Sequence, residues 1–144
     1  MLLGGAFLLG QEFPARTSTA TTLAPPPPTN SVPVLREVFT LLPCDQLTTI
    51  GLEGCAEHQS HRLDAGINTL RRQLYATLRT SAARGYFVAA EVAWTTYRSS
   101  LCQSEASVYQ GGSLAPVAYA RCLVRNDQRH LTALRDAAAR VTHP

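Results

Sequence analysis

The strongest constraint on this chain is a pair of cysteines on either side of a glycine-containing turn, between Trp94 and Cys122. Gly111-Gly112 is expected to end a helix, because glycine adopts a positive φ without a Cβ clash. Ser113 can cap the next helix, whose first turn then contains Pro116. The helix before the turn is predicted from apolar residues that recur every three to four positions: Trp94, Tyr97, Leu101 and Val108. This stretch therefore predicts a helical hairpin that could bring Cys102 and Cys122 together.

Two further cysteines, Cys44 and Cys55, lie earlier in the chain. Four cysteines in so small a protein suggest two disulfides and, if the chain is exported, an oxidising compartment. A Cys44–Cys55 or a Cys102–Cys122 bridge would each contribute about 3 kcal/mol in the chain-entropy model. The sequence leaves all three pairings open. Neither spacing resembles the close cysteine pairs of zinc sites.

Helical periodicity extends over most of the chain between residues 52 and 141. The first helix is predicted from about Leu52 to Arg84-Gly85, with the seam Ala56, Ser60, Leu63, Ile67, Leu70, Leu74 and Leu78. The second helix follows it with Phe87 and Ala90, and the third carries Tyr119, Leu123, Leu131, Leu134, Ala138 and Val141. Strand signals are weak. We predict an all-α fold, an antiparallel bundle of about three long helices stapled by two disulfides.

The N-terminal third divides into segments of different composition. Residues 1–13 contain an apolar run the size of a signal-peptide core, although no Lys or Arg precedes it; the alternative is a disordered apolar N-terminus. Residues 14–33 are rich in Pro and Thr and are predicted to form a disordered linker, as a spacer or as a remnant behind the signal. Residues 34–144 form the predicted folded domain, which opens with an extended or one-turn segment, Val34 to Pro43, packed onto it.

Taken together, the motifs resemble the LprI-type lysozyme-inhibitor domain, a family of small exported bacterial proteins with four cysteines. The matching elements, in order, are Cys44, Cys55, Asp64-Ala-Gly-Ile67-Asn68, Ala93-Trp94-Thr-Thr-Tyr97-Arg98 through Cys102, Gly111-Gly112-Ser113 and Cys122. The match covers roughly Cys44 to Leu134. One departure is that the family's named member is a lipoprotein, whereas this chain has no cysteine near the apolar segment to carry lipid.

The resemblance implies a secreted or extracytoplasmic, non-enzymatic binding domain whose partner is a lysozyme-type muramidase. Inhibition would occur by occlusion of the enzyme's cleft, through the Cys44–Cys55 region or the Gly111–Pro116 turn. Gly112 and Ser113 are therefore candidate contact residues. Disulfides would lower the entropy that such a binding loop loses.

Charge gives a second candidate contact. The net charge of +3, with arginine and no lysine, is too mild for a nucleic-acid binder. Glu53 and Glu57, with Glu37 and Asp45 nearby, form a locally acidic region that could meet a cationic partner; the alternative is an ordinary solvated loop. Animal-type lysozymes are strongly basic, so long-range attraction would not steer this mildly basic chain towards them. Contact with a membrane is expected only through the export signal.

Three polar residues of the family pattern are predicted to be structural. Asp64 and Asn68 are four residues apart and share one helix face beside the apolar seam. Arg98 lies one step off the stripe of the next helix. We expect Arg98 to pair with Asp64, and Asn68 to satisfy leftover backbone or side-chain groups. The alternative is a ligand-binding or catalytic role.

No motif supports catalysis. Glu57, His58 and His61 could supply metal ligands, but the H-E-x-x-H order of zinc hydrolases is absent, so no metal or cofactor is predicted. Ser113 does not lie in a G-x-S-x-G elbow, and no catalytic residue is assigned. The predicted function is therefore binding rather than enzymatic.

An arginine stripe on the third helix supports an alternative function. Arg121, Arg125 and Arg129 repeat every four residues, and Arg135 and Arg140 extend the basic region. The stripe could contact anionic cell-envelope polymers, which would make the domain an envelope-associated interaction module. The favoured alternative is a solvated helix face with Asp127 and Asp136 nearby.

Overall fold

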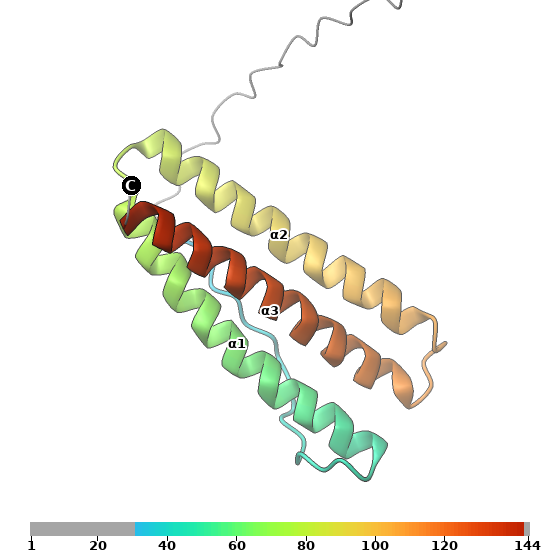
Figure 1. Cartoon of the computed structure of the whole chain (residues 1–144). Coiled ribbons are helices and arrows are strands. Elements are labelled where there is room, and N and C mark those ends of the chain that lie inside the picture. Colours follow the sequence, from blue (N-terminus) through green and yellow to red (C-terminus); the bar gives the residue numbers. More distant parts are fainter. Residues whose placement is uncertain (1–30, 143–144) are drawn as a thin grey trace, which may run out of the picture.

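The computed structural model describes residues 31–142, which contain three long helices and no strand. The helices are α1 (Thr49–Thr77), α2 (Ser81–Ser107) and α3 (Leu114–Thr142). Consecutive helices run in opposite directions, and α3 packs against both α1 and α2 (Figure 1). Disulfides join Cys44 to Cys55 and Cys102 to Cys122. The predicted all-α bundle with two disulfides is confirmed.

The predicted segment 1–13 and most of the predicted linker 14–33 lie outside the described residues. None of the described helices is both long and apolar enough to cross a membrane.

The first helix ends earlier than predicted. α1 stops at Thr77 instead of continuing to Arg84-Gly85, because Thr80 starts a new helix. The hydroxyl of Thr80 accepts a hydrogen bond from the N–H of Ala83 at 3.1 Å, which is an N-cap. Arg84 and Gly85 therefore belong to the first turns of α2. The helix boundary is therefore set by this polar cap and not by the glycine.

The break between α2 and α3 lies where it was predicted. α2 ends at Ser107, and the connecting turn contains Gln110 and Gly111 with φ of 50° and 76°. A positive φ suits glycine, since it has no Cβ to clash. α3 begins at Leu114, directly after Ser113, and Pro116 falls in its first turn.

An extended segment, residues 33–44, forms a fourth layer that we call the strap. It runs antiparallel to α1, so that Pro33 meets Arg71 near the end of α1 and Leu42 meets Glu57 near its start. Figure 1 shows the strap as the blue trace beside α1. It reaches α2 through Glu37, which bonds Arg98, and through Phe39, which packs against the buried cluster around Cys102. The strap therefore links α1 to α2.

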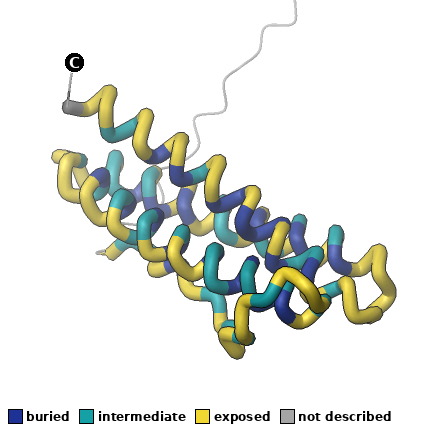
Figure 2. Tube along the Cα trace, turned by 60° about the horizontal axis from the view of Figure 1, so that its bottom comes forward, coloured by how far each residue is buried: buried dark blue, intermediate teal, exposed yellow. Residues whose placement is uncertain are grey.

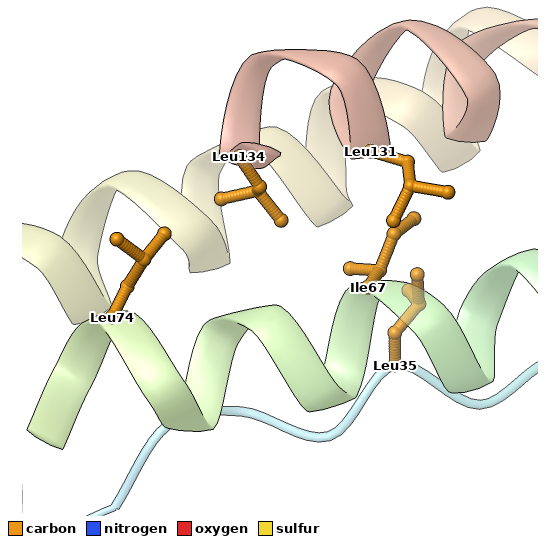
Figure 3. Packing of buried hydrophobic residues seen from close by; sticks show 5 residues of the cluster. All are labelled: Leu35, Ile67, Leu74, Leu131 and Leu134. Atoms are coloured by element: carbon orange, nitrogen blue, oxygen red, sulfur yellow. The ribbon is translucent and has the colours of Figure 1, made fainter. Parts of the chain in front are cut away.

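The apolar core joins the strap to α1 and α3. Leu35 from the strap packs with Ile67 and Leu74 of α1 and with Leu131 and Leu134 of α3 (Figure 3). Each such buried side chain contributes about 1.5–3 kcal/mol. Along the tube of Figure 2, buried positions follow the inner side of each helix, and exposed positions follow the outer side and the turns.

The predicted apolar stripe of α2 is partly wrong. Tyr97 and Val108 are 58% and 74% exposed, whereas Glu91 and Arg98 are buried. The buried line of α2 consists of Gly85, Val88, Glu91, Arg98, Cys102 and Ala106. Charged side chains occupy this line because opposite charges from other elements meet them there.

Two glycines of α1 let the end of the strap approach the helix closely. A Cβ on Gly54 would lie 2.4 Å from the carbonyl oxygen of Pro43, and one on Gly51 would lie 2.1 Å from that of Asp45. Both distances are far below van der Waals contact. The Cα atoms of Cys44 and Cys55 are accordingly only 4.2 Å apart.

Candidate functional site

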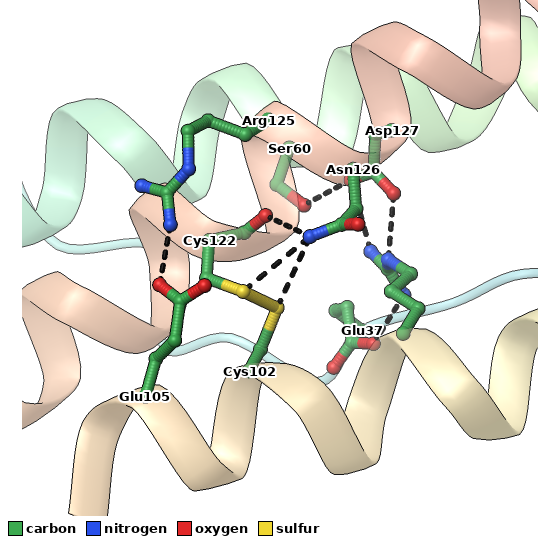
Figure 4. Close-up of a disulfide and its surroundings, with 9 residues drawn as sticks. Glu37, Ser60, Cys102, Glu105, Cys122, Arg125, Asn126 and Asp127 are labelled. Carbon is green, nitrogen blue, oxygen red and sulfur yellow. Dashed lines mark hydrogen bonds and ion pairs between the residues drawn. A yellow bond between two sulfur atoms is a disulfide. The ribbon is translucent and has the colours of Figure 1, made fainter. Parts of the chain in front are cut away.

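The guanidinium of Arg98 is fully buried, and three carboxylates surround it. Its Nη1 donates to Glu37 Oε1 at 2.7 Å, and its Nη2 donates to Asp64 Oδ1 at 3.2 Å and Asp127 Oδ2 at 3.0 Å. Its Nε lies 2.6 Å from Asp127 Oδ1, an ion-pair contact outside hydrogen-bond geometry. Ser60 donates to Asp127 at 3.1 Å (Figure 4). The strap and all three helices thus meet at one arginine.

One arginine cannot fully compensate three carboxylates in a buried site. Burial raises the pKa of Asp64 to about 6; Arg98 opposes this shift, and the carboxylate of Asp127 adds to it. Burial also raises the pKa of Asp127, against the opposing effect of Arg98. The cluster is therefore a place where the fold holds excess negative charge.

A second buried cluster lies further along α1 and α2. Arg71 Nε lies 2.6 Å from Glu91 Oε2, and His130 Nε2 lies 2.8 Å from the same oxygen. Burial alone would raise the pKa of Glu91, but its interactions with His130 and Arg71 hold that pKa below its ordinary value. Arg71 also donates to Pro33 O at 3.3 Å, which ties down the start of the strap.

Trp94 connects the two clusters. Its ring stacks on that of His130 with centroids 3.7 Å apart and planes 10° apart. The guanidinium carbons of Arg71 and Arg98 lie 5.4 and 5.7 Å from the Trp94 ring centroid, within cation–π range. Trp94 therefore positions both buried arginines.

The predicted polar residues lie together at the strap. Asp64 pairs with Arg98, and its other oxygen accepts from the backbone N–H of Glu37 at 3.4 Å. Asn68 accepts from the N–H of Leu35 and donates to its carbonyl, both at 2.8 Å. These contacts are internal to the fold, and we propose that they position the strap.

The predicted acidic contact region is not available as expected. Glu57 is buried and accepts the N–H of Leu42 at 3.1 Å, so it cannot meet a partner. Glu53 is half-buried, and burial together with Glu57 raises its pKa. The carboxylate of Glu57 instead holds the strap. The backbone of Leu42 and Pro43 lies close to Gly54, and this brings the N–H of Leu42 within reach of Glu57.

The predicted turn contacts, Gly112 and Ser113, are exposed. Beside them, Val108, Tyr109 and Leu114 line an open groove of about 380 Å³ between α2 and α3. The Cys102–Cys122 disulfide fixes the helix ends here and is fully buried. Asn126 donates to Cys122 O at 2.9 Å beside it (Figure 4).

The described histidines do not come together as a metal site. His58 Nε2 lies 3.1 Å from Leu42 O, so it belongs to the strap anchor, and His61 is exposed. Within residues 31–142, no three His, Cys, Asp or Glu side chains are placed to share a metal ion.

The surface is more basic than the net charge suggests. In the described part of the chain, nine arginines are exposed, and Asp136 is the only exposed acidic residue. Asp127, predicted to lie near the arginine stripe on a solvated face, is instead buried. Its carboxylate pairs there with the guanidinium of Arg98. On the stripe, Arg125 pairs with Glu105, whereas Arg121 and Arg129 are exposed.

Several residues of these clusters were missed by the sequence analysis: Glu37, Arg71, Glu91, Asp127 and His130. One signal could have found two of them. Asp127 interrupts the apolar stripe of α3 between Val124 and Leu131, and Glu91 does the same in α2 after Val88. A charged residue in an apolar stripe indicates an opposite charge on a neighbouring element.

A comparison with known protein families identifies the family of this chain. The family model described as "Lysozyme inhibitor LprI" matches residues 44–139, which include all four cysteines, Asp64, Asn68 and Arg98. The chain belongs to the LprI lysozyme-inhibitor family. No curated protein and no solved structure matches the chain.

Membership of the LprI family makes this a protein of the lysozyme-inhibitor type, in a family of inhibitors rather than enzymes. The implied partner is a lysozyme, and the two disulfides together with the family suggest an extracytoplasmic location. The matched region begins at Cys44, so most of the strap precedes it.

Proposed function

We propose that this protein inhibits lysozyme by occupying the enzyme's substrate cleft. The observation that carries the proposal is the match of residues 44–139 to the LprI family. Pre-organisation supports it, because the Cys44–Cys55 bridge fixes the end of the strap and the Cys102–Cys122 bridge fixes the exposed turn beside α3. A loop held in its bound conformation loses little entropy on binding.

A lysozyme assay on bacterial cell walls tests the proposal. The oxidised full chain is titrated into an animal-type lysozyme, and the rate of wall lysis is followed. We expect stoichiometric inhibition that a soluble chito-oligosaccharide weakens by competing for the cleft. Absence of inhibition by a chain shown to be folded by circular dichroism would overturn the proposal.

A second candidate function has one specific observation in its favour. Five exposed arginines lie on α3, a charge pattern suited to anionic polymers of the cell envelope: Arg121, Arg125, Arg129, Arg135 and Arg140. Binding of such a polymer at low salt, lost at high salt, would support an envelope-associated module. If the folded chain binds polymer and leaves lysozyme fully active, this function replaces inhibition.

A further inference from the structure

The outward side of the strap carries side chains that the fold does not use. Successive side chains of an extended chain point to opposite faces. Leu35 and Glu37 point inwards, to the core and to Arg98. Val34 and Val38 point outwards and are 73% and 93% exposed. The strap therefore presents an apolar surface to solvent along its length.

Between the two valines lies an unpaired cation. Arg36 is exposed and has no hydrogen bond or ion pair with any described residue. The carboxylate of its neighbour Glu37 is turned inwards and pairs with Arg98, not with Arg36. A hollow of about 150 Å³ on this side is lined by Arg36, Glu37, Val38, Phe39, Leu41 and His61. Charge and apolar surface thus coincide on one segment.

The strap is held at both ends and in the middle. Arg71 bonds Pro33 O, Asn68 bonds both backbone groups of Leu35, and the Cys44–Cys55 disulfide closes the far end. Such anchoring is typical of inhibitory loops, because an ordered segment loses less entropy when it binds.

A lysozyme cleft has the chemistry that this surface would complement. Retaining glycosidases place two carboxyl groups about 5 Å apart on either side of the scissile bond. In lysozyme, one of these groups lies in an apolar pocket. A guanidinium can bind carboxylates with two parallel hydrogen bonds. Local complementarity of this kind operates even when both proteins carry a net positive charge.

We propose that the strap is the inhibitory element, and that Arg36 enters the lysozyme cleft and pairs with its catalytic carboxylates. Val34 and Val38 contact the apolar walls on either side. This inference rests on the proposed cleft-blocking function and names the surface that performs it. At the groove beside the exposed turn at Gly112-Ser113, Arg125 is bound to Glu105, and the exposed Arg121 lies on α3, outside the anchored strap.

The test compares Arg36→Glu with a matched control, Arg129→Glu, in the oxidised full chain. Arg129 is also exposed and without an ion pair among the described residues, but it lies on α3. The inhibition constant is measured against an animal-type lysozyme on cell walls, and thermal melting checks folding. We expect Arg36→Glu to raise the inhibition constant at least about tenfold, and Arg129→Glu to change it less than about twofold. Val38→Asp, also at an exposed position, should weaken inhibition as well.

The outcomes separate the two proposals. If the unchanged chain does not inhibit, the cleft-blocking function fails and the inference fails with it. If the unchanged chain inhibits and folded Arg36→Glu inhibits equally well, only the strap inference is overturned. Equal losses in Arg36→Glu and Arg129→Glu would indicate a general charge effect and would also overturn it.

Discussion

The carboxamide of Asn68 binds the backbone of Leu35 with both of its polar atoms, accepting from the N–H and donating to the carbonyl at 2.8 Å each. The side chain of a helix residue thus makes the two backbone hydrogen bonds that a neighbouring β-strand would otherwise make. The strap gains two strand-like hydrogen bonds, and Leu35 is placed in the core.

Replacing Asn68 with Ala should release the middle of the strap. Loss of this amide leaves two backbone groups of Leu35 unpaired, so we expect a loss of about 1–3 kcal/mol in the free energy of unfolding. Limited digestion with trypsin should cleave after Arg36 faster than in the unchanged chain. Thr69→Ala is the control, because the Thr69 hydroxyl bonds only within α1. Equal cleavage rates in both variants would argue against this anchor.

Replacing Arg98 with Met should be among the most destabilising changes in the protein. The substitution leaves Asp64 and Asp127 buried without their cation, which typically costs about 3–5 kcal/mol. Urea unfolding followed by circular dichroism at pH 7 measures the change. Arg129→Met, at an exposed position, should stay within about 0.5 kcal/mol. A similarly small effect for Arg98→Met would mean that the cluster relaxes or admits water.

Stability should fall as the pH rises from about 4.5 to 7, owing to Asp64. Its pKa is about 6 in the folded protein and 3.8 ordinarily, so the folded state binds the proton more readily across this window. Protonated Asp64 therefore stabilises the fold, and its ionisation removes roughly 1–3 kcal/mol. The Asp64→Asn variant should lack this part of the pH dependence. Parallel urea curves for both proteins at pH 4.5, 5.5 and 7 provide the check; identical pH profiles would contradict the prediction.

Glu91 should change the stability in the opposite direction at lower pH, where the free energy of unfolding falls as the pH falls. Its pKa lies below the ordinary 4.5, so its stabilising effect is lost as the pH falls through and below that value. The Asp64 comparison is therefore made at pH 4.5 and above.

Gly54→Ala should separate the end of the strap from α1. The new Cβ would lie 2.4 Å from Pro43 O and 2.5 Å from Leu42 O, and backbone atoms must move to relieve the overlap. We expect a loss of about 1–3 kcal/mol. In Gly66→Ala the nearest atom is Leu131 Cδ1 at 3.4 Å, an ordinary contact, so this control should gain up to about 1 kcal/mol of helix stability. Thermal melting of the two variants distinguishes these outcomes.

The two disulfides should differ in their resistance to reduction. Cys44 is exposed, whereas Cys102 and Cys122 are fully buried, so a mild thiol reaches the Cys44–Cys55 bridge first. Loss of this bridge costs about 3 kcal/mol in the chain-entropy model. We expect inhibition to weaken while helicity persists, with alkylation at Cys44 and Cys55 detected by mass spectrometry. Alkylation of Cys102 before Cys44 would refute the order.

Local patterns were sufficient to predict the helices and the turn at Gly111-Gly112, because periodicity and glycine conformation depend on nearby residues. They were insufficient for the inner face of α2. Apolar periodicity assigned Tyr97 and Val108 to that face, where Arg98 and Glu91 actually lie. The charges that make those positions favourable come from distant parts of the chain.

Glu37 is the clearest example of a residue whose role depends on a distant part of the chain. It is 61 residues away from Arg98 in the sequence, and the residues around it indicated an exposed carboxylate. Only the path of the strap brings the two together. Glu57 was misplaced for the same reason, since the backbone N–H that it binds belongs to the strap.

The disulfide connectivity bears on how the protein matures. Each bridge joins two consecutive cysteines of the sequence, which are 11 residues apart in the first bridge and 20 in the second. A chain that crosses a membrane N-terminus first would present Cys44 and Cys55 together, and Cys102 and Cys122 later. An oxidase acting on thiols in their order of emergence would therefore form the native bridges without reshuffling.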